Sequence, residues 1–225
     1  MKKLERLAEA RTPDGTILAL HRHDGDYMIR AGGAELMSTR HHNSEDRLAE
    51  VACAPLRDRA AARVLIGGLG FGFTLKAALR VLGADAQVVV AELVRAVIDW
   101  NDTPDYGLAC AAMHDARVEI RHADVADVLR ESAGGFDAIM LDVDNGPDPM
   151  TTARNGALYG DAGIRMSAGA LRPGGLLVYW SAQEDRKFER RLRGAGLAVE
   201  TVRVWSHGTS GTLHTLFVAG RPIRG

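Results

Sequence analysis

The residues best suited to chemistry begin with a glycine-rich turn that follows an apolar run. Val64-Leu65-Ile66 leads directly into Gly67-Gly68-Leu69-Gly70-Phe71-Gly72, and a helix is predicted to follow. Glycines permit a tight turn and let a ligand approach the backbone, and the helix N-terminus adds a partial positive charge. We therefore predict ligand contacts at Gly68, Gly70 and Gly72. Any tight strand-to-helix turn could use the same glycines, so this motif needs support from elsewhere in the chain.

Two acidic residues follow at positions that suit a bound nucleoside. Glu92 ends the next apolar run, about 20 residues after the loop, where a carboxylate can accept hydrogen bonds from both ribose hydroxyls. Asp124 follows the third apolar run and is placed to receive an adenine amino group. Asp124 could equally be the N-cap of a helix, a role that Asp often fills. In series with the glycine loop, the two acids favour nucleoside binding.

A third acidic position follows the apolar run at 136–141. Asp142 and Asp144 stand directly after it, before the turn-forming Asn145-Gly146-Pro147. In open α/β sheets, ligands bind at the carboxyl ends of the strands, so both carboxylates are candidate catalytic groups. They could accept a proton from an amine or pair with an ammonium group. A purely structural turn explains Asn145 to Pro147 better than it explains Asp142.

The elements that must position these residues change in character along the chain. Three short β-like runs come first, at 16–20, 26–30 and 34–38, and Asp24-Gly25 is a favoured hairpin dipeptide between the first two. Beyond residue 63, continuous apolar runs alternate with helical patterns, which predicts a parallel sheet covered on both faces. These strands are expected at 64–66, 88–91, 118–120, 138–141 and 176–179, and the helices at 74–82, 94–100, 125–130, 162–171 and 186–194. Two final strands at 198–204 and 213–218, joined only by a loop, predict an antiparallel edge.

Composition places limits on the class of protein. The chain has 225 residues, of which 46% are hydrophobic and 25% charged, as in ordinary globular domains. Its formal net charge of −1 gives no indication of a nucleic-acid or membrane partner. Cys53 and Cys110 lack metal-ligand spacing and are expected to be buried free thiols in helices. Without an apolar leader or an 18-residue apolar run, a cytoplasmic location is the default expectation.

Taken together, these motifs resemble the spermidine synthase family, the polyamine aminopropyltransferases, which share the class I methyltransferase fold. The resemblance covers nearly the whole chain. It rests on the order of the loop between Val64 and Leu79, Asp142 at the family's catalytic aspartate, Leu158-Tyr159, and the stretch ALRPGGLLVYWSAQED. It implies an α/β fold with a Rossmann-like sheet, made of a small N-terminal β-hairpin domain over residues 1–43 and an S-adenosylmethionine-binding domain over residues 44–225. It also implies a small-molecule acceptor and a possible homodimer.

Several positions depart from that family's pattern. We place Phe71 where the family usually has an aspartate that binds the donor's amine, and Asn145 where a second acid is expected. The Tyr-His-Glu stretch is replaced around Glu45, and Ser206-His207-Gly208 stands where the Tyr-Pro element is expected. Because these losses fall on amine contacts, we expect methyl transfer from S-adenosylmethionine by a small margin. The alternatives are aminopropyl transfer from decarboxylated S-adenosylmethionine, with Asp142, Asp144 and Glu184 forming an acidic pocket, and a binding module without turnover.

The histidines are weaker candidates for a role in chemistry. His207 and His214 flank a loop near the predicted carboxyl edge, and one of them could act as a base, although loop histidines are more often solvated. His21 with His23, and His41-His42 with Asp46, lack a complete set of ligands. We therefore expect no metal site. A nicotinamide-dependent oxidoreductase is disfavoured because the loop is not a full dinucleotide fingerprint.

Overall fold

The chain forms two β-sheets, of which the first is a small antiparallel meander. The computed structural model describes residues 4–143 and 153–223. Strands pair in sequence order in the first sheet: β1 (Glu5–Arg11), β2 (Ile17–His23), β3 (Asp26–Ala31) and β4 (Ala34–Ser38). The predicted hairpin is confirmed, because His23 pairs with Asp26 across Asp24-Gly25, both at positive φ. The strand β1 was not predicted.

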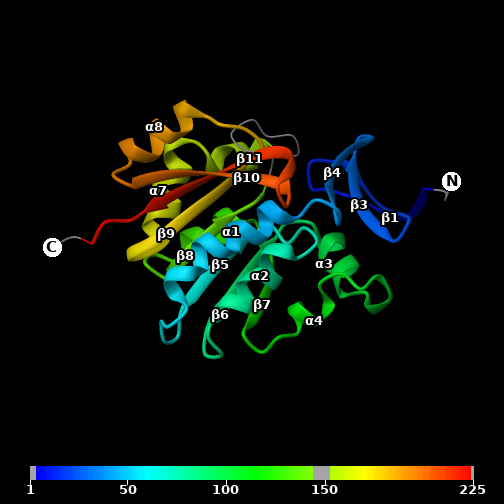
Figure 1. Ribbon diagram of the computed structural model, residues 1–225, viewed down its shortest axis with the longest axis horizontal. Helices are drawn as coiled ribbons and strands as arrows, with labels where there is room; N and C mark the ends of the chain where they lie inside the picture. Colours follow the sequence, from blue (N-terminus) through cyan, green and yellow to red (C-terminus); the bar gives the residue numbers. More distant parts are fainter. Residues whose placement is uncertain (1–3, 144–152, 224–225) are drawn as a thin grey trace.

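The second sheet has seven strands in the order β10-β11-β9-β8-β5-β6-β7. Five are parallel, whereas β11 and β10 form the predicted antiparallel edge. Their bounds are β5 (Arg63–Gly67), β6 (Gln87–Glu92), β7 (Val118–His122), β8 (Phe136–Leu141), β9 (Leu171–Ser181), β10 (Ala198–His207) and β11 (Ser210–Gly220). The meander lies at one end of this larger sheet, beside α3 (Figure 1). The predicted α/β architecture with an N-terminal antiparallel sheet is thus observed.

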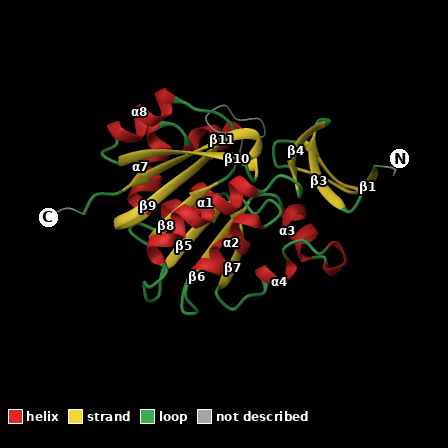
Figure 2. Cartoon of the chain, viewed as in Figure 1, coloured by secondary structure: helices red, strands yellow, loops and turns green. Residues whose placement is uncertain are grey.

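Helices cover both faces of the large sheet (Figure 2). They are α1 (Asn43–Cys53), α2 (Phe73–Val81), α3 (Arg95–Asp102), α4 (Cys110–Met113), α5 (Val125–Glu131), α6 (Ala153–Leu158), α7 (Asp161–Ala170) and α8 (Arg186–Gly194), with short 3₁₀ turns η1 (Ala54–Leu56) and η2 (Pro104–Tyr106). No helix in the described ranges is long and apolar enough to cross a membrane.

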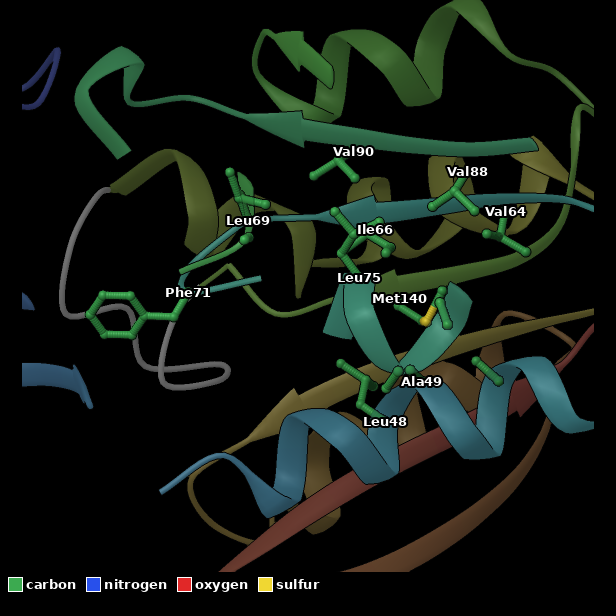
Figure 3. Packing of buried hydrophobic residues seen from close by; sticks show 14 of the residues in the cluster. Leu48, Ala49, Val64, Ile66, Leu69, Phe71, Leu75, Val88, Val90 and Met140 are labelled. Atoms are coloured by element: carbon green, nitrogen blue, oxygen red, sulfur yellow. The ribbon is translucent and has the colours of Figure 1, made fainter. Parts of the chain in front are cut away.

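Alternation along the central strands builds two hydrophobic cores. Val64 and Ile66 of β5 pack with α1 and α2 on one face, whereas Leu65 between them packs on the other face with α5 and α7. Figure 3 shows Leu48 of α1 and Leu75 of α2 in the first of these cores, with Ile66. Because successive side chains of a strand point to opposite faces, a continuous apolar run is what a strand buried on both faces requires.

The buried Asp137 carboxylate links the amino ends of β5, β8 and β9. Asp137 of β8 is 3% exposed, and it accepts hydrogen bonds from the backbone N–H of Arg63 at 2.8 Å and the Arg172 guanidinium at 2.7 Å. Arg59 forms an ion pair with its other oxygen at 2.8 Å. Both guanidinium groups are partly exposed, so the arginines keep part of their hydration while the carboxylate is fully paired.

Replacing Asp137 with alanine should therefore destabilise the fold. We expect Asp137→Ala to lower the free energy of unfolding by about 2–4 kcal/mol, because it leaves a buried N–H and two arginines without their acceptor. Chemical denaturation monitored by circular dichroism measures the change. Asp127→Ala removes an exposed pair with Arg130 on α5 and should cost less than about 1 kcal/mol. Equal costs for the two variants would show that Asp137 is not a structural anchor.

Candidate active site

The glycine-rich loop connects β5 to α2 and is held where it leaves β5 by two backbone hydrogen bonds. The Gly68 N–H donates to the Ala91 carbonyl at 2.9 Å, and the Asp142 N–H donates to the Gly67 carbonyl at 3.0 Å. These bonds fix the loop against the carboxyl ends of β6 and β8. The loop therefore lies where the sheet brings the ends of the three strands together.

The three predicted glycines have different roles in this loop. All have positive φ, at 89° for Gly68, 52° for Gly70 and 71° for Gly72. A Cβ on Gly68 would lie 2.5 Å from the Asp142 carbonyl oxygen, and one on Gly72 would lie 2.4 Å from the Ala109 Cβ. At Gly70 the nearest atom is the Met37 Sδ at 3.4 Å. Gly68 and Gly72 are thus required by packing, whereas Gly70 faces a more open space.

Glu92 holds the loop as well as lining the site. It is buried at the end of β6, where Oε2 accepts from the Leu69 N–H at 2.9 Å and Oε1 accepts from the Val94 N–H at 2.8 Å. Burial raises the pKa of Glu92, although these two hydrogen bonds oppose the rise. A carboxylate can accept about four hydrogen bonds, so its capacity to bind ribose hydroxyls is not exhausted. That role remains a prediction.

Asp124 serves as the N-cap of α5. Its Oδ1 accepts from the Ala126 N–H at 2.9 Å, and the residue also lines the same pocket as the glycine loop. The capping alternative considered from the sequence is therefore observed, and it is compatible with a ligand contact. The proposed adenine contact stays a prediction.

A pocket of about 370 Å³ brings the predicted residues together. It lies at the carboxyl ends of β5, β6, β7 and β8, and Leu36 and Met37 of the N-terminal meander form part of its wall. Of the predicted positions, Gly68, Gly70, Glu92, Asp124 and Asp142 line it. Gly72 does not, and instead begins α2. Asp144 and Asn145 lie outside the described residues.

The described lining of this pocket is strongly acidic. Five carboxylate residues contribute to it, and no lysine or arginine does so within the described ranges. The carboxylates are Glu35, Glu45, Glu92, Asp124 and Asp142. Glu184, which we expected among them, is exposed and forms an ion pair with Arg203 instead. Glu35 was not named from the sequence, and Glu45 was named only at a departure from the family's pattern, because these residues come from β4 and α1, far from the loop in the chain.

Asp142 and Glu45 both line the pocket, and their carboxyl groups interact electrostatically. Burial raises the pKa of Asp142 well above its usual range, and the nearby charge of Glu45 adds to the rise. The pKa of Glu45 is raised mainly by burial, although Ser44 opposes the rise by donating a hydrogen bond to Glu45 Oε2 at 2.5 Å. Two carboxylates that repel each other in this way favour either a bound proton or a cationic ligand between them.

His214 connects to the same pair through Ser44. Its Nδ1 lies 3.0 Å from the Ser44 Oγ. With the Ser44 hydroxyl hydrogen directed to Glu45, the ring would donate from Nδ1 and leave Nε2 as the basic nitrogen. Burial and the neighbouring His41 lower the pKa of His214, which favours the neutral ring. His214 lies on β11 and lines the pocket, whereas His207 ends β10 and is exposed, so neither is a loop residue.

Phe71 occupies the wall of the pocket rather than its polar part. It is 3% exposed and lines the cavity. Figure 3 shows its ring directed away from the Leu48 and Leu75 side chains of α1 and α2. An apolar ring at this place can pack against a ligand, while the acidic groups come from Glu45 and Asp142 instead.

Comparison with solved structures identifies the fold. Spermidine synthase from Thermotoga maritima superposes with a TM-score of 0.76 at 19% identity, over 99% of this chain and 75% of that chain. A spermidine synthase in complex with the transition-state analogue AdoDATO gives 0.78 at 19% identity, over 99% and 76%. A probable spermidine synthase from Corynebacterium glutamicum gives 0.64 at 15% identity, over 95% and 79%.

Sequence comparison adds no assignment of its own. No protein-family model matches the chain, and no curated protein matches it. The spermidine synthase fold therefore extends over nearly the whole chain at low sequence identity, as the resemblance predicted.

The glycine geometry predicts an order of sensitivity within the loop. Gly68→Ala should destabilise the protein by about 2–4 kcal/mol, because it combines a positive φ with a clash against backbone. Gly70→Ala should cost about 1–2 kcal/mol, from strain alone. Thermal unfolding of both variants tests the order. If Gly70→Ala is the more damaging change, the assignment of the close contact to Gly68 is wrong.

The acidic pair predicts that removing one charge stabilises the folded state. Because the pKa of Asp142 is raised on folding, its contribution is lost as the pH rises above the unfolded value of about 4. Asp142→Asn should therefore raise the Tm at pH 8 by a few degrees, and the gain should shrink toward pH 4.

A melting series across pH measures this effect of Asp142→Asn. Asp124→Asn is the matched control, because asparagine caps a helix as well as aspartate does and should leave the Tm nearly unchanged at every pH. A lower Tm for Asp142→Asn at pH 8 would contradict a repulsive pair.

Proposed function

We propose that this protein transfers a group from a sulfonium nucleoside to an amine, and that its donor is decarboxylated S-adenosylmethionine. The observation that carries the proposal is the set of acidic groups in the pocket, which five carboxylate residues and no described lysine or arginine line. This ranks aminopropyl transfer above methyl transfer from S-adenosylmethionine, the reaction that the sequence favoured. The shared fold with a spermidine synthase that binds the transition-state analogue AdoDATO supports the same choice.

The choice of donor follows from electrostatics. S-adenosylmethionine carries an α-carboxylate, whereas its decarboxylated form presents only an ammonium group and the sulfonium. A carboxylate held near Asp142 and Glu45 would meet two further acids in a buried setting, at a high cost without a cationic partner. An ammonium group in that place would instead relieve their repulsion. The acidic pair also suits an acceptor amine, which is cationic until it loses a proton.

The described residues divide into two functional groups under this proposal. Gly68, Gly70, Glu92 and Asp124 hold the nucleoside, and Asp142 with Glu45 orients the ammonium groups. His214 is the base that takes a proton from the acceptor, because its neutral form is favoured. The donor supplies an activated C–S bond, which breaks as the amine nitrogen bonds to carbon and leaves methylthioadenosine. The protein chiefly has to align the two reactants and remove the proton.

The nucleoside product distinguishes the candidate reactions. Aminopropyl transfer releases methylthioadenosine, whereas methyl transfer releases S-adenosylhomocysteine. We expect methylthioadenosine, formed only with the decarboxylated donor and only when a diamine is present, measured by chromatography of reactions with each donor. S-adenosylhomocysteine formed from S-adenosylmethionine would overturn the proposal in favour of methyl transfer. Tight binding of both donors without any product would favour the binding module.

The Glu45 carboxylate provides a further test in the same assay. Glu45→Gln should raise the KM for the diamine by about tenfold, because one charge-assisted contact is lost while the shape is kept. Glu50→Gln is the matched control, since Glu50 lies on the same helix but is exposed and pairs with Arg47. An unchanged KM in Glu45→Gln would remove Glu45 from the amine site.

A further inference from the structure

A cluster of side chains that could bind a metal ion lies outside the pocket. Asp102 ends α3, Cys110 begins α4, and His114 is the C-cap residue of α4. One donor atom from each lies within 4.8 Å of the others, and this is the one such His/Cys/acid cluster among the described residues. The His114 Nε2 is 2.7 Å from the Asp102 Oδ1, and the Cys110 Sγ is 3.8 Å from the same oxygen.

The donor set has the chemistry of a transition-metal site. Cys110 and His114 are four residues apart on a helical turn, so their side chains share one face. Thiolate, imidazole and carboxylate are the ligands of Zn²⁺, and donors around a tetrahedral ion lie about 3–4 Å apart. The observed distances need only a small adjustment. The spacing of the two cysteines gave no indication of this site, because only one of them takes part.

A simple surface ion pair does not account for the cluster as well. His114 and Asp102 are both well exposed, and an exposed pair of this kind contributes little to stability. Such a pair also does not require a thiol beside its shared oxygen. Three protein donors with one open position are the set that Zn²⁺ takes when a water completes its coordination.

The residues next to the cluster contact the glycine-rich loop. The residue before Asp102 is Asn101, whose Nδ2 donates to the Gly70 carbonyl at 2.7 Å. The residue before Cys110 is Ala109, whose side chain packs directly against Gly72. An ion that links Asp102 to Cys110 would thus restrain the segment between them, whose flanking residues contact the glycine-rich loop.

We propose that Asp102, Cys110 and His114 bind one Zn²⁺ ion. The ion would link the end of α3 to α4 and so stabilise the glycine-rich loop, which the neighbouring Asn101 and Ala109 contact. A water would complete the coordination of the ion, which takes no part in the proposed group transfer.

Cobalt substitution tests the site directly. The full-length protein, stripped with a chelator and kept in a non-coordinating reductant, is titrated with Co²⁺. We expect one equivalent to bind with a thiolate-to-cobalt charge-transfer band and tetrahedral visible bands, and Zn²⁺ to displace it. Cys110→Ala should abolish the charge-transfer band, and His114→Ala or Asp102→Ala should weaken Co²⁺ binding by about tenfold or more.

A matched thiol control separates this site from others. Burial raises the pKa of Cys53 to about 12, so Cys53→Ala should leave the cobalt spectrum unchanged. Zn²⁺ should raise the Tm of the wild-type protein and of Cys53→Ala, but not of Cys110→Ala. Absence of the charge-transfer band in the wild type, or its persistence in Cys110→Ala, would overturn the proposal. These readouts do not depend on turnover, so they are independent of the proposed transferase activity.

Discussion

The buried Glu92 carboxylate is the interaction on which the geometry of the site depends. It accepts the backbone N–H groups of Leu69 and Val94, and so joins the glycine-rich loop to the end of the neighbouring strand. Without it, the Leu69 and Val94 N–H groups would lose their acceptor, and the loop would keep only the backbone hydrogen bond from Gly68 to Ala91 of β6. The same side chain is the predicted ribose ligand. Its capacity to bind a nucleoside and its role in shaping the loop are therefore inseparable.

The Glu45 and Asp142 carboxyl groups lower the stability of the folded protein. Glu45 and Asp142 are held close together in a setting that disfavours their charged forms, which costs folding free energy at neutral pH. Destabilising groups are retained at functional sites where the ligand offsets the cost. Under the proposed function, a cationic ligand would do so here, because it would neutralise both carboxylates at once. The pocket is thus arranged for its occupied state.

The sequence predicts the central part of this structure well. The apolar runs, the Asp24-Gly25 hairpin and the antiparallel edge are each dictated by local patterns, and all are found. The strand β1 is missed because it is an edge strand with charged residues and little burial. The domain boundary at 43/44 and the homodimer remain predictions.

The acidic residues that line the pocket could be predicted from the sequence only in part. The loop, Glu92, Asp124 and Asp142 follow strands at regular spacing, so their convergence is predictable from topology. Glu45 and Asp102 of the proposed zinc site have no such spacing, because Glu45 reaches the pocket from α1 and Asp102 approaches Cys110 and His114 only through the turn between α3 and α4. The preference for methyl transfer rested on Phe71 and the other departures from the family's amine contacts, without knowledge that Glu35 and Glu45 also line the pocket.

The position of β5 between β6 and β8 has a consequence for the order of folding. The meander β1–β4 pairs only neighbouring strands, so we expect it to form early from local hairpins. By contrast, β5 contacts β8 about 70 residues later in the chain, and its pairing must wait until that segment has been synthesised. Gly68 meets the Asp142 backbone only when this long loop closes. The ligand pocket is therefore among the last parts of the protein to take shape on the ribosome.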